Sequence, residues 1–389
     1  MDKKISFKIL TENCGDFVKD FPKAGVDEKL MMVYQLIKIY DEHKEYKVNE
    51  MNKSPLIREC PDAEKKYNFI IKAVTEFLKE VSSLKDEEGE YLPVASEAQT
   101  YIGICYEYGI LSYPQDSFTA FNYFNMASRD GNAFSIYKVG TCYEKGVGKL
   151  KCDEKASTYY RLSAKLGLVE SLHVYGASLL YGYMGLDPDP SEGFFYLKMA
   201  AKNADKLYPY PCFDLAQIFE GKIVKGVQDI NYAFEIYTRG AMLGCHNCQN
   251  KLGKVFEYGQ LNRPKNIGVA LSWYKKAAEN GHTDSQIAMS AFYYTGYRGL
   301  VEKNIELSLF WAKKAALKGD HQSAFTVAEF IENGIGGQKN IFLALYWYNI
   351  SFHIGNKKAE FKVRDLEKKL ESKKRNVEKG FFSFFNPFK

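Results

Sequence analysis

The chain repeats itself with a period of 36 to 40 residues, and no other feature of the sequence limits its fold so strongly. Each unit contains an aromatic, alanine-rich run that ends at a small residue. These closing residues are Gly131, Gly167, Ala204, Gly244, Gly281, Gly319 and Gly355. Self-similarity at this period is typical of helical hairpins stacked in a solenoid, where each unit packs only on its neighbours. The period therefore predicts an all-α repeat protein.

The half of each unit before the closing residue reads as one helix, called here the second helix. Eleven residues before the closing residue lies another small side chain, and aromatic or aliphatic side chains follow three and four positions later. These small residues are Ala120, Ala156, Gly193, Ala233, Ala270, Ser308 and Ala344. All three tryptophans, Trp273, Trp311 and Trp347, fall in one register. Because small side chains allow helices to approach closely, we expect a tight helix pair in every unit.

The half of each unit after a closing residue reads as the first helix of the next pair. Glycine recurs in one register, as at Gly140, Gly176 and Gly253, and another glycine ends runs such as residues 142–146. The ending glycines suit the left-handed C-cap of a helix. An Asp or Asn then stands where an N-cap should accept backbone N–H bonds. These residues are Asp116, Asp153, Asp189, Asp229, Asn266, Asn304 and Asn340. Together the signals predict seven helix-loop-helix units over about residues 96–355.

The pattern resembles the Sel-one-like repeat (SLR) family, a relative of the tetratricopeptide (TPR) repeats. The resemblance rests on the small and glycine positions, the Tyr-Glu-x-Gly ending and the Ala-x2-aromatic-aromatic step. It implies an all-α, right-handed α-α superhelical solenoid of about seven SLR/TPR-like helical hairpins with capping helices at both ends. It also implies that the protein is an adaptor or scaffold, because similar proteins bind proteins or peptides in the concave groove of the solenoid. Gly193 and Ala204 depart from the pattern, as does an insertion at 206–211, so the geometry should change locally there.

One face of the first helix is expected to line this groove. Positions six, ten and thirteen after each closing residue share a face by helical spacing. The predicted partner-binding residues on it are Tyr137, Thr141, His173, Asn250, Lys254, Tyr294, Phe325 and Glu329. Their mixture of rings, amides and charges favours a protein or peptide partner. The other interpretation is a solvated helix face with a few packing residues.

Residues 1–95 form an N-terminal helical cap or a small helical module. Apolar side chains at helical spacing indicate helices over residues 62–84 and about 27–45. A cap would cover the apolar face of the first repeat, whereas a module would bind a partner of its own. Ile5, Phe7 and Ile9 alternate as in a short strand.

The C-terminal residues hold the excess positive charge of the chain. Residues 356–389 have a net charge of +6, and the rest of the chain is close to neutral, which argues against a nucleic-acid partner. We expect a basic amphipathic helix over 356–379 and a Phe-rich tail over 380–389. The tail either caps the solenoid or touches an anionic membrane. The residues expected to do so are Lys373, Lys374, Arg375, Phe381, Phe382, Phe384 and Phe385.

Motifs for catalysis and metal binding are weak. The six histidines are scattered, and nucleophile, base and orienting residue do not fall in one register. The run from Cys245 to Cys248 has a metal-like spacing but no second pair at the distance of a zinc site. Cys248 occupies a small-residue register, which favours packing. We therefore expect no enzyme, no metal and no cofactor.

Composition narrows the setting of the protein. The chain is 46% hydrophobic, which excludes a predominantly disordered protein. It contains no run of 18 apolar residues and no signal-peptide core, so we expect a cytoplasmic protein with free thiols. Delivery into a host cell and peripheral membrane association remain open. The first functional hypothesis is a scaffold that binds a protein or peptide, in one setting as a bacterial host-interaction factor. The alternative is a regulatory subunit that activates or localises an enzyme at a membrane.

Overall fold

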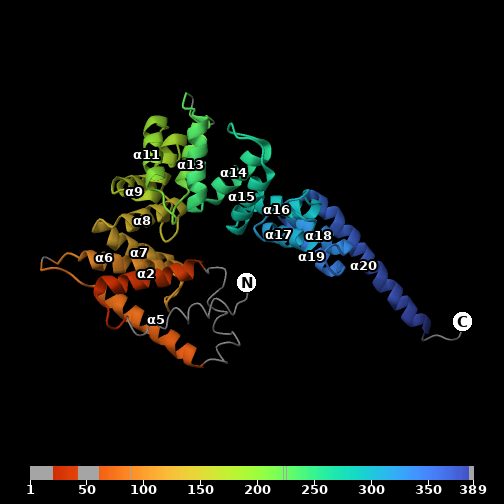
Figure 1. The fold of residues 1–389 in the computed structure, drawn as a ribbon. Helices are drawn as coiled ribbons and strands as arrows, with labels where there is room; N and C mark the ends of the chain where they lie inside the picture. Colours follow the sequence, from red (N-terminus) through yellow and green to blue (C-terminus); the bar gives the residue numbers. More distant parts are fainter. Residues whose placement is uncertain (1–20, 43–60, 88, 222, 225, 385–389) are drawn as a thin grey trace. The chain divides into compact units, whose positions relative to one another are not determined.

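The computed structural model describes residues 21–42, 61–87, 89–221, 223–224 and 226–384 (Figure 1). Every helix or strand named within these residues is an α-helix, which confirms the predicted all-α repeat solenoid. The chain divides into two compact units, Met1–Asn203 and Ala204–Lys389. The division falls next to the insertion at 206–211, where the sequence predicts a local change of geometry.

The first unit holds the N-terminal helices and three helix pairs. α2 (Val26–Glu42) and α5 (Pro61–Val81) lie close to the two predicted N-terminal helices. The pairs are α6 (Pro93–Tyr108) with α7 (Ser117–Arg129), α8 (Ala133–Lys145) with α9 (Asp153–Lys165), and α10 (Val169–Tyr181) with α11 (Pro190–Asn203).

The second unit holds four helix pairs and a long C-terminal helix. The pairs are α12 (Pro211–Phe219) with α13 (Ile230–Leu243), α14 (His246–Tyr258) with α15 (Ile267–Glu279), α16 (Thr283–Thr295) with α17 (Ile305–Leu317), and α18 (His321–Asn333) with α19 (Ile341–His353). The last helix is α20 (Lys357–Phe384). In each pair the even-numbered helix is the first helix of a repeat and the odd-numbered one is the second.

In repeats 1 and 5 the two helices are in close contact at a glycine of the first helix. A Cβ atom built on Gly253 of α14 would lie 2.6 Å from ring carbons of Tyr274 on α15. A Cβ atom on Gly103 would lie equally close to the ring of Phe124. Tyr274 and Phe124 are fully buried, so neither ring can move aside. The predicted tight helix pair is confirmed in these two repeats, and Gly103 and Gly253 cannot be replaced by a larger residue without a shift of the helices.

A hydrogen bond between a tyrosine and a glutamate recurs across the helix pairs. The tyrosine lies on the second helix, and the glutamate lies near the end of the first helix of the same repeat. The bonds are Tyr160 to Glu144 at 2.6 Å, Tyr237 to Glu220 at 2.9 Å, Tyr274 to Glu257 at 2.6 Å and Tyr348 to Glu332 at 2.7 Å. Burial of each ring and its bond to a carboxylate raise the tyrosine pKa well above its usual range.

The predicted helix caps are correct at six of seven positions. The N-cap side chains that accept backbone N–H bonds are Asp116, Asp189, Asp229, Asn266, Asn304 and Asn340. The prediction is wrong at Asp153, because α9 already begins there and Cys152 occupies the cap position without a side-chain bond. Ending glycines such as Gly146 and Gly259 adopt the predicted left-handed conformation.

The N-terminal helices pack against the first helix of the first repeat. Leu30 and Val33 of α2, and Val74 and Leu78 of α5, are buried in one apolar cluster with Ile102 of α6. This packing removes the apolar face of α6 from water. The predicted strand at residues 5–9 lies outside the described residues.

α20 packs against the last repeat over its first three turns. Ala359, Val363 and Leu366 are buried in the cluster of α18 and α19, and Lys362 pairs with Glu332 at 2.9 Å. The helix continues to Phe384, beyond its predicted end at residue 379. An α-helix rises about 1.5 Å per residue, so Phe381 lies about 22 Å along the axis from Leu366. The backbone of α20 therefore carries the start of the Phe-rich segment away from the last repeat (Figure 1).

Candidate partner-binding surface

All eight predicted partner-binding positions lie on first helices, and their exposure separates them into two groups. Tyr137 and Thr141 lie on α8, His173 on α10, Asn250 and Lys254 on α14, Tyr294 on α16, and Phe325 and Glu329 on α18. Six are half-buried or exposed, whereas Asn250 and Phe325 are only 8% and 9% exposed.

Phe325 is a core residue and does not present its ring to solvent. It packs edge-on against Tyr348 of α19, with the ring centroids 5.2 Å apart. Val327 and Ala328 belong to the same buried cluster. Position six of this repeat therefore faces the second helix, and the expectation that Phe325 lines an open surface is wrong.

Asn250 is buried because its position faces the next repeat. Its side-chain oxygen accepts a bond from the Ser285 hydroxyl at 2.9 Å, 35 residues further along the chain. Thr100 and Ser135 make the same link at 2.7 Å, also 35 residues apart. In these two repeats position six therefore joins consecutive first helices, a contact that helical periodicity within one helix cannot show.

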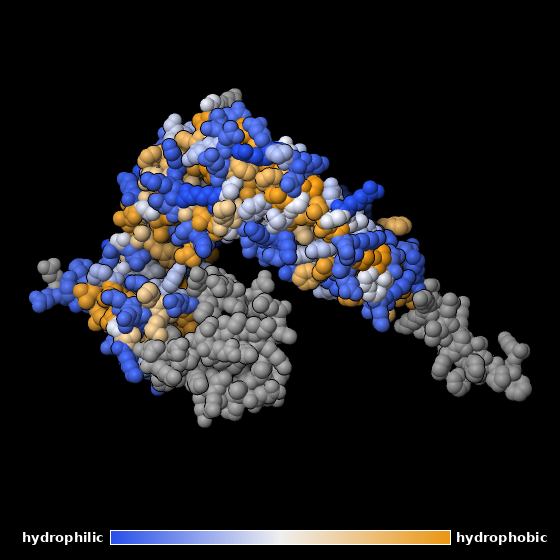
Figure 2. Space-filling model, in the orientation of Figure 1, coloured by the Kyte–Doolittle hydropathy of each residue, from blue (hydrophilic) through white to orange (hydrophobic). Residues whose placement is uncertain are grey.

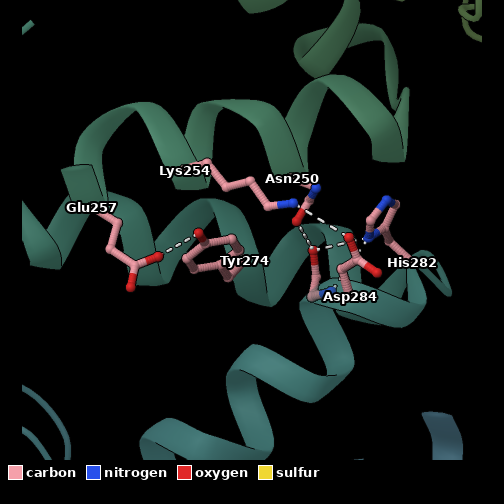
Figure 3. Close-up of polar contacts among 7 residues, drawn as sticks. Asn250, Lys254, Glu257, Tyr274, His282 and Asp284 are labelled. Atoms are coloured by element: carbon pink, nitrogen blue, oxygen red, sulfur yellow. Dashed lines mark hydrogen bonds and ion pairs between the residues drawn. The ribbon is translucent and has the colours of Figure 1, made fainter. Parts of the chain in front are cut away.

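The exposed part of the predicted surface in the second unit is built around Lys254. Figure 3 shows Lys254 and Asn250 reaching from α14 toward the start of α16. The Lys254 ammonium lies 3.3 Å from the Asp284 carboxylate, and both side chains are exposed. An exposed pair of this kind contributes about 0.5 kcal/mol, so Lys254 can exchange Asp284 for a carboxylate of another molecule at little cost.

His282 forms the corner of this site. Its Nδ1 atom accepts a bond from the Ser285 amide at 3.3 Å and caps α16 (Figure 3). Burial of the ring lowers the pKa of His282 to about 4. The nearby positive or ionisable groups of His246 and Lys254 also lower this pKa, whereas the Asp284 carboxylate raises it. The ring is therefore neutral at pH 7 and serves as a hydrogen-bond acceptor.

A depression of about 590 Å³ opens beside Lys254. Its lining residues are Glu220, Ile230, Lys251, Lys254, Gln260, Leu261 and Asn262. Lys251 is largely buried and pairs with Glu220 at 2.8 Å. The exposed ammonium of Lys254 at the edge and the amides of Gln260 and Asn262 give the depression polar groups that suit an extended peptide with an acidic side chain.

Lys251 was not among the predicted residues, although the sequence contains a signal for it. A lysine follows a first-helix glutamate by 30 or 31 residues in three places. These ion pairs are Glu107 with Lys138 at 2.7 Å, Glu220 with Lys251 at 2.8 Å and Glu332 with Lys362 at 2.9 Å. In the first two places the pair links a repeat to the first helix of the next repeat, and in the third it links the last repeat to α20. Lys251 thus fixes one wall of the depression.

In the first unit two of the predicted residues, Tyr137 and Thr141, lie against Tyr160 of α9. Tyr137 packs against Tyr160 at 5.6 Å between ring centroids, and burial raises the Tyr137 pKa. Thr141 donates to the Tyr137 carbonyl at 3.1 Å and lies 3.3 Å from the Tyr160 hydroxyl. His173 on α10 is half-buried.

The predicted tail residues lie at the limit of the described chain. Lys373, Lys374, Arg375, Phe381, Phe382 and Phe384 belong to the backbone of α20, but their side chains lie outside the described residues, as does all of Phe385. In the described part of the chain, none of the helices is both long and apolar enough to cross a bilayer.

Cys245 and Cys248 are fully buried beside Cys212. Among the described residues, no three His, Cys, Asp or Glu side chains gather in an arrangement that could hold a metal ion.

A protein-family model matches most of the repeat region. The model of the Sel1 repeat matches seven consecutive segments, residues 96–132, 133–168, 169–205, 212–245, 246–282, 283–320 and 321–352. The segments cover the seven helix pairs, and residues 206–211 fall between two of them.

Several curated relatives are named as regulators of chitin synthase. The chain is 30% identical to Chitin synthase regulatory factor 3 of Schizosaccharomyces pombe over 278 residues, which are 71% of this chain and 30% of the relative. It is 27% identical to Chitin synthase regulator SKT5 of Saccharomyces cerevisiae over 319 residues, which are 80% of this chain and 45% of the relative. The chain thus spans less than half the length of these relatives. They are fungal regulators and do not support a bacterial host-interaction factor.

Solved structures share the fold at lower identity. A Sel1 repeat protein from Oxalobacter formigenes has a TM-score of 0.56 at 21% identity and covers 76% of this chain and 86% of its own. The protein c5321 of uropathogenic Escherichia coli, described as displaying an SLR fold, has a TM-score of 0.53 at 19% identity, with 90% and 82% covered.

Proposed function

The chain belongs to the Sel1 repeat family, whose members are protein-interaction scaffolds, and from this premise we propose that it is a non-catalytic regulatory protein that binds a chitin synthase. The proposal rests on sequence similarity, because the alignment with a chitin synthase regulator extends over as much as 80% of this chain. In this role the chain positions or activates the enzyme and performs no chemistry itself.

The depression beside Lys254 supports a particular binding mode. Lys254 offers an exposed ammonium, and Tyr294 on the next first helix offers a ring that is 42% exposed. A peptide of the enzyme with an acidic and an aromatic side chain would place its carboxylate on the Lys254 ammonium and stack its ring on Tyr294. Asn250 and Phe325 do not take part, because both are buried within the unit.

Binding to detergent-solubilised chitin synthase of Saccharomyces cerevisiae tests the proposal. We expect Lys254→Glu combined with Tyr294→Ala to weaken binding at least tenfold, because charge repulsion replaces attraction and a contact ring is lost. The matched control combines Lys275→Glu with Tyr232→Ala, the same two changes at exposed positions on the second helices α15 and α13. Undiminished binding by the first variant would contradict the groove, and no binding by the unmodified chain would contradict the function.

A second role concerns the C-terminal helix. Residues 356–389 carry a net charge of +6 and five Phe in the last ten positions, which together favour an anionic membrane surface. In this role the tail places the regulator beside a membrane enzyme. Flotation with anionic liposomes, with and without residues 380–389, tests it, and equal flotation of both chains would refute it.

A further inference from the structure

α19 is apolar on all sides, although only one side is buried. Its 13 residues include no Asp, Glu, Lys or Arg, and the one histidine, His353, is the last residue of the helix. Ala344, Trp347 and Tyr348 face the core. On the opposite side Phe342, Leu343 and Tyr346 are 72%, 42% and 59% exposed. A helix that is apolar all round is normally buried all round, so this side is suited to contact something other than water.

α17 has exposed apolar side chains in the same register one unit earlier, although Glu306 stands at the position of Phe342. Leu307 and Phe310 are 36 residues before Leu343 and Tyr346, and they are 39% and 46% exposed. Leu317 at the end of the helix is 76% exposed. We call the six side chains Leu307, Phe310, Leu317, Phe342, Leu343 and Tyr346 the outer apolar face. Figure 2 shows hydrophobic side chains at the surface of this part of the molecule, which Figure 1 labels α17 and α19.

The repeat architecture does not require this face to be apolar. At the positions of Leu307 and Phe310, α7 has Thr119 and Asn122, and α9 has Lys155 and Thr158, whereas α11 pairs a charged and an aromatic residue, Glu192 and Phe195. Those helices belong to repeats with the same fold and with similar buried contacts between their two helices. The apolar side chains on α17 and α19 therefore need another explanation than packing.

Lysines accompany the outer apolar face. Lys314 lies on the exposed side of α17, with its ammonium 4.8 Å from the centroid of the Phe310 ring and 5.2 Å from that of Trp311. Lys318 follows Leu317, and Lys357 and Lys358 follow α19, all exposed. Aromatic and aliphatic side chains with lysines beside them match the boundary between acyl chains and anionic headgroups. The charge is thus complementary to an anionic bilayer.

We propose that the outer apolar face of α17 and α19 inserts into the surface of an anionic bilayer. Protein interfaces are depleted in lysine and enriched in arginine, whereas this face carries lysines, and neither α17 nor α19 contains an arginine. Its rings are exposed on the helices, with Phe310, Tyr346 and Phe342 at 46%, 59% and 72%. The contact is separate from that of the C-terminal tail and does not depend on chitin synthase.

Vesicle binding by the full chain tests this contact. The vesicles contain phosphatidylcholine with or without 30% phosphatidylserine, and no other protein is added. The test variant carries Phe310→Gln, Phe342→Gln and Tyr346→Gln. The matched control carries Phe118→Gln, Phe195→Gln and Tyr183→Gln, the same changes at side chains that are 55%, 57% and 58% exposed in the first unit. Both variants keep the whole tail, and thermal unfolding verifies that both fold.

We expect the test variant to lose at least tenfold in partitioning to phosphatidylserine vesicles, with the control within twofold of the unmodified chain. The unmodified chain should bind less to phosphatidylcholine alone and less at 500 mM salt, because the lysines contribute. Equal partitioning of the test variant and the control overturns the proposal. If the test variant keeps its vesicle binding but loses self-association or chitin synthase, the face docks a second copy or a protein, and the bilayer contact is wrong.

Discussion

Repeats 2 and 7 share their internal contacts and differ in the face that they present to solvent. In repeat 2 Tyr160 bonds Glu144, and in repeat 7 Tyr348 bonds Glu332, at nearly equal distances of 2.6 and 2.7 Å. A small residue of the first helix lies in the same register of both repeats, Gly140 and Ala328. The seam between the two helices is thus almost the same in both.

The exposed sides of the second helices are unlike each other. α9 carries Lys155 and Thr158 where α19 carries Leu343 and Tyr346. The comparison teaches that buried seams specify the hairpin and that the outward positions are free to acquire a surface of their own. Substitutions in the seam should therefore act on stability, and substitutions on the outward positions should act on binding.

The largest effect should come from filling a seam. We expect Gly253→Ala to lower the free energy of unfolding by about 3 kcal/mol, because its Cβ would collide with the buried Tyr274 ring. Gly268→Ala is the matched control, since a Cβ there has its nearest neighbour at 3.5 Å. Urea unfolding followed by circular dichroism measures both. A loss below about 1 kcal/mol for Gly253→Ala would show that the seam can widen.

A smaller effect should follow from removing one hydroxyl from the seam. Tyr160→Phe and Tyr348→Phe each remove a hydrogen bond to a carboxylate, which is worth about 1.5 kcal/mol. Tyr346→Phe, on the exposed side of α19, serves as the control and should leave the unfolding midpoint unchanged. If the two seam variants differ by more than about 1 kcal/mol, the seams of repeats 2 and 7 are not equivalent.

The caps of the first helices should differ in their response to acid. Asn132 accepts the Ser135 amide at the start of α8, and His282 accepts the Ser285 amide at the start of α16. The pKa of His282 falls from its ordinary value of 6.5 to about 4 in the folded chain. Since the folded state disfavours the protonated ring, His282 stabilises the fold above pH 6.5 and loses this contribution as the pH falls toward 4.

His282→Asn should remove this part of the acid sensitivity while keeping a cap. The difference in unfolding temperature between pH 7 and pH 5 should be smaller in the variant than in the unmodified chain. Asn132→Asp changes the equivalent cap of α8 and serves as the control. It should not reduce the difference in unfolding temperature between pH 7 and pH 5, so a reduction in both variants would mean that any change of cap has this effect. An unchanged pH response in His282→Asn would mean that another group titrates.

The smallest effect on stability should come from the outer apolar face. Phe342 is 72% exposed, so Phe342→Gln should change the free energy of unfolding by less than about 0.5 kcal/mol. Glu154→Gln, at the exposed position of α9 that corresponds to Phe342, is the matched change in repeat 2. A loss of 2 kcal/mol or more in Phe342→Gln would show that the side chain packs within the chain.

Much of the architecture was predictable because its signals are local. The period, the cap residues and the small positions all act within one hairpin, so the sequence places the helices and six of seven N-caps correctly. The predicted N-cap at Asp153 is wrong because α9 begins one residue earlier than expected. The position of a helix end depends on small energy differences. The partner-binding surface was predictable only in part, since Lys254 is exposed where expected but Asn250 and Phe325 are not.

The amino-acid sequence by itself determined the family, the seven hairpins and the close approach of their helices, because each depends on residues within about 40 positions. Tertiary structure alone decided which side of a first helix is left open. Asn250 bonds Ser285 of the next repeat, and Lys251 pairs with Glu220 of the one before. Helical spacing groups side chains on one face, but the neighbouring repeats determine whether that face meets another helix or water.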